Sequence, residues 1–172
     1  MDISGIEVFK ILNNMSQYQF LPFEELPKHI DYIFLIDDDE DDLDLFAEAL
    51  ETLKLPIEYK GFKNGEEFLN YVQNIDTSKR VKVFLDLNMP IISGVEVLKK
   101  VKSDSITGNI WITIYSTSAS PKDLEETFTF GANSYLQKPT SFEDLKRYIL
   151  KSLERFITKH QSKCLNSYLI NS

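Results

Sequence analysis

Short β-rich runs alternate with longer segments of helical spacing from about residue 32 to about residue 157. The predicted strands are Tyr32–Ile36, Ile57–Tyr59, Val81–Leu85, Ile110–Tyr115 and Ser134–Leu136. Strands that are separated by helices favour parallel pairing, because a parallel connection needs a crossover of a dozen or more residues. The alternation therefore predicts an α/β fold, a five-stranded parallel sheet doubly wound by helices.

Between and after these strands, apolar residues recur at intervals of three and four, as on the buried face of a helix. The five stripes are Leu43, Phe46, Ala47, Leu50 and Leu53; Phe68, Val72 and Ile75; Val95, Leu98 and Val101; Leu124, Phe128 and Ala132; and Phe142, Leu145, Ile149, Leu153 and Phe156. Ser120-Pro121 and Thr140-Ser141 are typical helix starts, and Gly131 is a typical stop. In the acidic run of residues 37–42, Asp41 or Asp42 is expected near a helix cap, where the helix dipole favours acids.

The chain is expected to form one domain, because 172 residues are too few for two ordinary ones. We assign residues 31–158 to this domain, residues 1–30 to an N-terminal extension, and residues 159–172 to a short polar tail that is expected to be frayed. Neither extension is large enough for an output domain, so we expect a stand-alone protein.

Composition excludes several classes of protein. The net charge of -8 argues against direct binding to nucleic acid, which requires an excess of Lys and Arg. Cys164 is the single cysteine, which rules out an internal disulfide and a thiolate metal cluster. The N-terminus lacks the features of a secretory signal, and no apolar run approaches the roughly 20 residues of a membrane span. A cytoplasmic protein without a membrane partner is therefore expected.

Polar residues follow four of the predicted strands at the edge where a parallel sheet carries its working site. The first strand ends in Asp37-Asp38-Asp39, the third in Asp86-Leu87-Asn88-Met89-Pro90, the fourth in Ser116-Thr117-Ser118 and the fifth in Gln137-Lys138-Pro139. Three acids, a hydroxyl and a lysine should therefore converge at this edge.

Asp37, Asp38 and Asp86 in one cleft would repel one another unless a cation lay among them. Hard carboxylate oxygens suit Mg²⁺. A carboxylate beside Mg²⁺ and a lysine is equipped to attack phosphorus and form an aspartyl phosphate. The pattern thus predicts phosphoryl transfer to a carboxylate, with Ser116 as a further hydrogen-bond donor.

These motifs together are similar to one known family. The residues that carry the likeness are Ile33-Phe34-Leu35-Ile36-Asp37-Asp38, Asp86-Leu87-Asn88-Met89-Pro90 with Gly94, Ser116-Thr117, Tyr135 and Lys138-Pro139. Over roughly residues 31–157 the chain resembles the receiver domain of bacterial response regulators, of the single-domain chemotaxis-regulator type found in two-component systems. The resemblance implies the flavodoxin-like strand order 2-1-3-4-5.

The resemblance also implies how the acidic site works. Asp86 matches the phospho-acceptor, Asp38 a direct ligand of Mg²⁺, and Asp37 a ligand through water. Asn88 matches the position whose backbone carbonyl completes the metal shell. Lys138 matches the lysine that pairs with the phosphoryl group. The protein would then be no ordinary enzyme, since it would catalyse only its own phosphorylation and dephosphorylation.

The remaining matches imply a two-state switch. Ser116 resembles the switch hydroxyl, and Tyr135 the switch aromatic that moves inward when the hydroxyl is drawn to the phosphate. Pro139 fits the cis-proline position of the family, which would orient Lys138. A histidine kinase or a histidine phosphotransfer protein would donate the phosphoryl group, and the face formed by the last two helices and the last strand would signal to an effector protein. Homodimerisation through that face stays open.

Several alternatives compete with this interpretation. An EF-hand would place Asp37, Asp39, Asp41 and Glu48 on calcium-ligand positions, but Asp42 stands where the glycine is needed. A flavodoxin-like cofactor binder would be repelled by the acidic first loop, and an aspartate phosphatase would need an acid at Asn88. A receiver fold used as a phosphorylation-independent binding module remains the open alternative.

Overall fold

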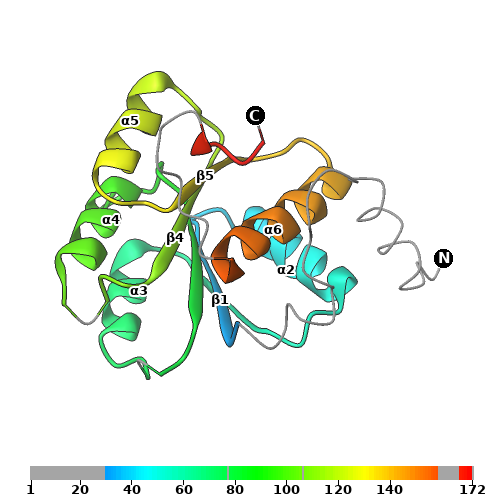
Figure 1. The fold of residues 1–172 in the computed structure, drawn as a ribbon, viewed down its shortest axis with the longest axis horizontal. Coiled ribbons are helices and arrows are strands. Elements are labelled where there is room, and N and C mark those ends of the chain that lie inside the picture. Colours follow the sequence, from blue (N-terminus) through cyan, green and yellow to red (C-terminus); the bar gives the residue numbers. More distant parts are fainter. Residues whose placement is uncertain (1–29, 77, 106, 159–166, 172) are drawn as a thin grey trace.

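The computed structural model describes residues 30–76, 78–105, 107–158 and 167–171. In this part of the chain, strands and helices alternate as predicted (Figure 1). The strands are β1 (Tyr32–Ile36), β2 (Glu58–Phe62), β3 (Val81–Leu85), β4 (Trp111–Ser116) and β5 (Ser134–Gln137). The helices are α2 (Glu40–Leu53), α3 (Gly65–Val72), α4 (Gly94–Ser103), α5 (Pro121–Thr129) and α6 (Phe142–Ile157). The predicted N-terminal extension lies outside the described residues, except for Ile30.

All five strands are parallel and stand in the order β2-β1-β3-β4-β5. The predicted sheet and its order are therefore confirmed. At the carboxyl edge the register pairs Ile36 with both Phe62 and Leu85, and Ser116 with Gln137. Because the strands end nearly level, the residues that follow them meet at one edge.

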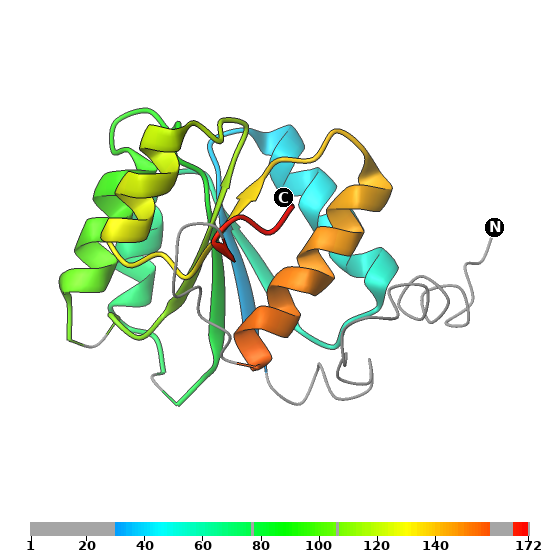
Figure 2. The same cartoon turned by 45° about the horizontal axis from the view of Figure 1, so that its top comes forward.

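Helices cover both faces of this sheet, as Figures 1 and 2 show: α3, α4 and α5 lie on one face and α2 and α6 on the other. Each face has its own apolar core. Phe34, Val83 and Ile112 are fully buried in the first core, and Leu35 and Phe84 in the second. Burying one such side chain contributes roughly 1.5–3 kcal/mol, so the two cores fix the strands that carry the site.

Polar caps set the helix ends close to where the sequence predicts them. Ser120 and Ser141 cap α5 and α6, each accepting a hydrogen bond from the backbone N–H three residues on. Gly131 follows α5 with a φ of 85°, a conformation that glycine adopts without strain. Asp41 and Asp42 lie in the first turn of α2, near its cap as predicted. The cap itself is Asp39, which accepts from the Asp41 N–H at 2.9 Å. Its extended backbone leaves its carboxylate free to turn back to that N–H.

The end of the chain differs from the sequence-based expectation. Residues 167–171 were expected to be frayed, but Tyr168 and Ile170 are fully buried, and Leu169 forms a parallel bridge with Tyr135 of β5. Figures 1 and 2 show this red segment beside β5, between α5 and α6. Burial of these two side chains stabilises the segment, although the tail around them is polar. The rest of the tail lies outside the described residues.

Candidate functional site

The candidate site lies at the carboxyl edge of the sheet, where backbone hydrogen bonds between neighbouring segments fix three of its residues. The Asp86 N–H donates to the carbonyl of Ile36 at 2.9 Å, and the Asp37 N–H donates to the carbonyl of Phe62 at 3.0 Å. The Lys138 N–H donates to the carbonyl of Ser116 at 2.8 Å. Each residue directly follows a strand, so the rigid sheet sets their relative positions.

Three carboxylates converge at this edge, as the sequence predicts. Asp37, Asp38 and Asp86 each offer one oxygen, and these oxygens all lie within 4.8 Å of one another. Asp37 is 1% exposed and Asp86 4% exposed, whereas Asp38 is open to solvent. Hard oxygen ligands with one open side suit Mg²⁺, which keeps several of its waters. The donor set therefore fits the metal that the sequence predicts.

Lys138 also reaches this edge, but its closest partners are Asp37 and Asp42. Its Nζ lies 2.7 Å from Asp37 Oδ2, 2.6 Å from Asp42 Oδ2 and 3.8 Å from Asp86 Oδ1. From the sequence, the helix dipole alone explained an acid at Asp42, and this contact was not predicted. Its place in the first turn of the helix that follows Asp37 was the available signal, because such a residue stays near the strand end.

The buried charges perturb one another. Burial raises the pKa of Asp37 to about 6, although the hydrogen bond from Lys138 opposes the shift. Burial likewise raises the pKa of Asp86, and the positive charge of Lys138 again opposes it. Burial disfavours the charged form of Lys138, but its hydrogen bonds to Asp37 and Asp42 outweigh this effect and raise its pKa. The site thus holds excess negative charge that one lysine only partly balances.

Asn88 and Ser116 complete the side of the site next to Asp86. The Asn88 N–H donates to Asp86 Oδ2 at 2.8 Å, which orients the carboxylate. The side-chain amide of Asn88 donates to Ser116 Oγ at 3.3 Å, a contact that the sequence did not predict. Ser116 is fully buried at the end of β4. The Asn88 side chain therefore links this hydroxyl to the loop that carries Asp86.

Tyr135 lies in β5, behind the loop that follows β4. Its side chain is fully buried, and its hydroxyl donates to the carbonyl of Ser118 at 2.7 Å. Its ring also packs edge-on against Tyr168, with centroids 5.9 Å apart. The predicted switch aromatic is therefore held between that loop and the C-terminal segment.

Gly94 brings the start of α4 against the Asp86 loop. Its N–H donates to the carbonyl of Leu87 at 3.1 Å. A Cβ at this position would lie 2.0 Å from the backbone oxygen of Asp86, so that no other residue fits without movement of the loop. The glycine noted in the sequence thus supports the position of Asp86.

With this geometry established, similarity to known proteins identifies the family. Residues 33–150 match the family model of the response regulator receiver domain. The chain belongs to that family. As a receiver domain it is a signalling module of two-component systems, rather than a typical enzyme.

Curated relatives agree with this assignment. The chain is 32% identical over 133 residues to the probable methanogenesis regulatory protein FilR2 of Methanothrix harundinacea, an alignment that covers 76% of this chain and 86% of the relative. It is 34% identical over 101 residues to the chemotaxis protein CheV2 of Helicobacter pylori, with 55% of this chain covered. The match spans only 32% of CheV2, which is a longer protein.

Solved structures show the same fold. The phosphorylated cyanobacterial phytochrome response regulator RcpA is 28% identical, with a TM-score of 0.65 and coverage of 77% of this chain and 97% of RcpA. The Mn²⁺-bound form of the response regulator Rcp1 is 25% identical, with a TM-score of 0.62 and coverage of 73% and 93%. Receiver domains of this family thus include a metal-bound structure and a phosphorylated one.

One expectation that came from the family resemblance was wrong. The described residues contain no cis peptide bond, so the bond between Lys138 and Pro139 is trans. The trans form is the more stable one of an X–Pro bond. Lys138 is instead positioned by its N–H bond to Ser116 and by its two carboxylate partners.

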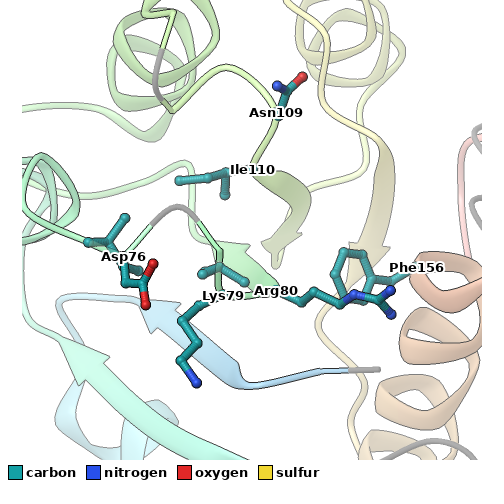
Figure 3. A pocket seen from close by; sticks show the side chains of 8 residues that line it. Asp76, Lys79, Arg80, Asn109, Ile110 and Phe156 are labelled. Atoms are coloured by element: carbon teal, nitrogen blue, oxygen red, sulfur yellow. The ribbon is translucent and has the colours of Figure 1, made fainter. Parts of the chain in front are cut away.

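A separate pocket of about 200 Å³ lies far from these carboxylates. It is formed near the amino ends of β3 and β4, and Figure 3 shows Arg80, Ile110 and Phe156 among the side chains around it. The acidic site is therefore an open edge of the sheet and not this pocket.

Among the described residues, no helix is long and apolar enough to cross a bilayer.

Proposed function

We propose that the receiver domain, residues 31–158, accepts a phosphoryl group on Asp86 from a phosphohistidine of a histidine kinase or phosphotransfer protein. The observation that carries the proposal is the cluster of Asp37, Asp38 and Asp86, whose oxygens lie within 4.8 Å of one another beside the ammonium group of Lys138. A site of this composition can bind a divalent cation and a phosphoryl group together.

Asp37, Asp38 and Asp86 would hold Mg²⁺, with the backbone carbonyl of Asn88 as a further ligand. Bound Mg²⁺ would neutralise part of the charge on the phosphoryl oxygens and draw them toward the carboxylates. Burial raises the pKa values of Asp37 and Asp86, and a bound cation would favour their ionised forms. Support for the metal also comes from the relative Rcp1, which has been crystallised with Mn²⁺.

In the transfer step, the Asp86 carboxylate would attack phosphorus in line with the leaving group. A P–O bond forms as the P–N bond of the phosphohistidine breaks, and the imidazole leaves with a proton from solvent. Asp86 is prepared for this step by the Asn88 N–H, which holds one of its oxygens at 2.8 Å and leaves the other to react. The product is an aspartyl phosphate.

Lys138 would then balance the charge of the new group. Its Nζ already lies 3.8 Å from Asp86, but it is shared between Asp37 and Asp42. Phosphorylation adds roughly two negative charges, so the ammonium should move toward the phosphoryl oxygens. Asp42 competes for Lys138, and we expect it to limit how tightly the lysine holds the phosphoryl group.

Ser116 and Tyr135 would relay the change to a protein-binding face. The hydroxyl of Ser116 would leave Asn88 for a phosphoryl oxygen, and the loop after β4 would follow it. The Tyr135 hydroxyl is hydrogen-bonded to Ser118 in that loop, so a shift of the loop should also move the Tyr135 side chain. The face formed by α5, β5 and α6 would therefore change shape for an effector protein.

The direct test is incubation with Mg²⁺ and acetyl phosphate, followed by intact mass measurement. We expect a gain of one phosphoryl group that requires Mg²⁺ and is lost in Asp86→Asn. The matched control is Asp44→Asn, which removes an exposed carboxylate of α2 outside the cluster and should keep the gain. Failure of the folded wild-type protein to gain mass from acetyl phosphate or from a phosphorylated histidine donor would favour the phosphorylation-independent binding module instead.

A further inference from the structure

The C-terminal segment Ser167–Asn171 pairs with β5 along the edge of the sheet. The Tyr135 N–H donates to the carbonyl of Tyr168 at 2.9 Å, and the Ile170 N–H donates to the carbonyl of Tyr135 at 2.7 Å. The Asn171 side chain extends this ladder, because it donates to the Gln137 carbonyl at 2.9 Å and accepts from the Gln137 N–H at 3.2 Å. The segment thus satisfies backbone groups that an edge strand otherwise leaves open.

Two of its side chains enter the cores on opposite faces of the sheet. Tyr168 enters the core beside α5, where its ring packs edge-on against Phe128 and its hydroxyl donates to Thr127 Oγ1 at 3.1 Å. Ile170 enters the opposite core, beside α6. Both side chains are fully buried. The edge therefore offers one slot for an aromatic residue with a hydroxyl group, and a second slot, two residues later, for a branched aliphatic residue.

Helix α6 supplies a row of cations that bind the backbone of the segment. Arg155 donates to the carbonyls of Ser167 at 3.1 Å and Tyr168 at 3.4 Å, and Lys151 donates to the carbonyl of Ile170. These contacts reach carbonyl groups, which every peptide has. Backbone recognition with two side-chain slots is the usual arrangement by which a sheet edge binds an added strand.

The segment also covers the face by which the receiver domain would signal. It lies between α5 and α6 over β5, and it contacts Tyr135 through both backbone and ring. A partner that binds this edge must therefore displace the segment. Because the segment is part of the same chain, it competes at an effective concentration on the order of millimolar.

We propose that Ser167–Asn171 is an autoinhibitory segment, and that a partner protein binds the α5–β5–α6 face by displacing it with an extended segment of its own. The partner segment would carry a tyrosine followed two residues later by a branched aliphatic residue. This proposal concerns the edge of β5 and does not require phosphorylation of Asp86, so it can fail or succeed independently of the proposed function.

The first test uses amide hydrogen exchange of the full wild-type chain, followed by NMR. We expect the amides of Ile170 and Tyr135 to exchange at matching rates, at least tenfold slower than unprotected amides and at least tenfold faster than the amide of Ile114 in β4. Exchange of Ile170 at the unprotected rate would overturn the proposal, because the segment would not be bound. Exchange at the rate of Ile114 would also overturn it, because the segment would then leave only when the whole domain unfolds.

The second test measures binding of a fluorescent peptide, Ser-Tyr-Leu-Ile-Asn-Ser, to the full-length chain. Tyr168→Asp should release the bound segment, so this variant should bind the peptide at least tenfold more tightly than the wild type. Leu45→Asp is the matched control, because it places the same charge on an exposed residue of α2 and should bind like the wild type. Equal binding by the wild type and a folded Tyr168→Asp variant, or no binding to either, would contradict the proposal.

Discussion

At the scale of single residues, Asp42 shows what the sequence pattern leaves out. The helix dipole alone explains an acid in the first turn of α2, so nothing in the pattern singles Asp42 out from its neighbours. The structure places its carboxylate 2.6 Å from Lys138, a residue 96 positions later in the chain. Such a pairing depends on how far each side chain projects from its strand or helix, and strand and helix periodicity does not give that distance.

Asp37, Asp38, Asp86, Ser116 and Lys138 were easier to locate, because each lies at or directly after a strand end. A parallel sheet brings all carboxyl ends to one edge, so the sequence needs only the strands to predict which residues meet there. The wrong prediction of a cis bond before Pro139 did not come from the pattern of strands. It came from resemblance to a family, and the conformation of one peptide bond does not follow from the pattern of strands.

The short distance between Gly94 and the backbone of Asp86 predicts that even one added methyl group disturbs the site. Gly94→Ala would place a Cβ 2.0 Å from the backbone oxygen of Asp86 and so displace the loop that carries Asp86. We expect the affinity for Mg²⁺ to fall at least tenfold, together with a loss of stability of about 2 kcal/mol from overpacking. Isothermal titration with Mg²⁺ and urea unfolding measure the two effects.

The control for this variant is Gly61→Ala, in which the added methyl group would meet mainly the flexible side chain of Leu43, at 3.1 Å. Its affinity for Mg²⁺ should stay within about twofold of the wild type, since Gly61 lies in β2, away from the carboxylates. Equal Mg²⁺ affinity in wild type and Gly94→Ala would show that the loop does not need this close contact.

At the scale of elements, the sequence locates the strands of the buried sheet centre better than those of its edge. The prediction for β3 matches the observed Val81–Leu85, because continuous apolar residues mark a strand covered on both faces. The predicted second strand ended at Tyr59, whereas β2 extends to Phe62. Lys60 and Gly61 make its second half hard to predict, since a charged residue and a glycine are both uncommon in strands.

Helix α4 carries a lysine whose burial makes stability depend on pH. Lys102 donates to the carbonyl of Ile110 at 2.7 Å and to Asn133 Oδ1 at 3.2 Å, and burial lowers its pKa to about 8 from the usual 10.5. Between these two pH values the folded protein has released this proton, whereas the unfolded chain retains it. The free energy of unfolding should therefore rise with pH in this window.

Comparison of the wild type with Lys102→Met isolates this effect from the other titrating groups. Relative to the variant, the wild type should gain about 1–2 kcal/mol in unfolding free energy between about pH 7 and about pH 9.5. Urea unfolding at both pH values provides the measurement. A difference that stays constant or falls as pH rises would show that Lys102 keeps its proton in the folded protein.

At the scale of the whole molecule, the C-terminal segment joins two cores that the sheet otherwise separates. Tyr168 belongs to the core beside α3, α4 and α5, and Ile170 to the core beside α2 and α6. The polar composition of residues 159–172 suggested a frayed tail. The short apolar run from Tyr168 to Ile170 was the one signal against that, and it is too short to predict a binding site on a sheet edge.

This packing predicts that the tail contributes to global stability. Tyr168→Ala should lower the unfolding free energy by about 3 kcal/mol, because it leaves a cavity in a closed core. Leu45→Ala removes a side chain that is 41% exposed and should cost less than about 1 kcal/mol. Urea unfolding of both variants tests the difference, and equal stabilities would mean that the segment is not packed in solution.

We propose that Asp86, and no other acid of the cluster, takes the phosphoryl group. The most direct measurement is to phosphorylate the protein with acetyl phosphate and Mg²⁺, reduce it with borohydride, and map the modified residue by peptide mass spectrometry. Reduction converts an aspartyl phosphate to homoserine, so we expect homoserine at position 86. Homoserine at position 37 or 38 instead, or an unmodified Asp86 in a protein that has gained a phosphoryl group elsewhere, would contradict it.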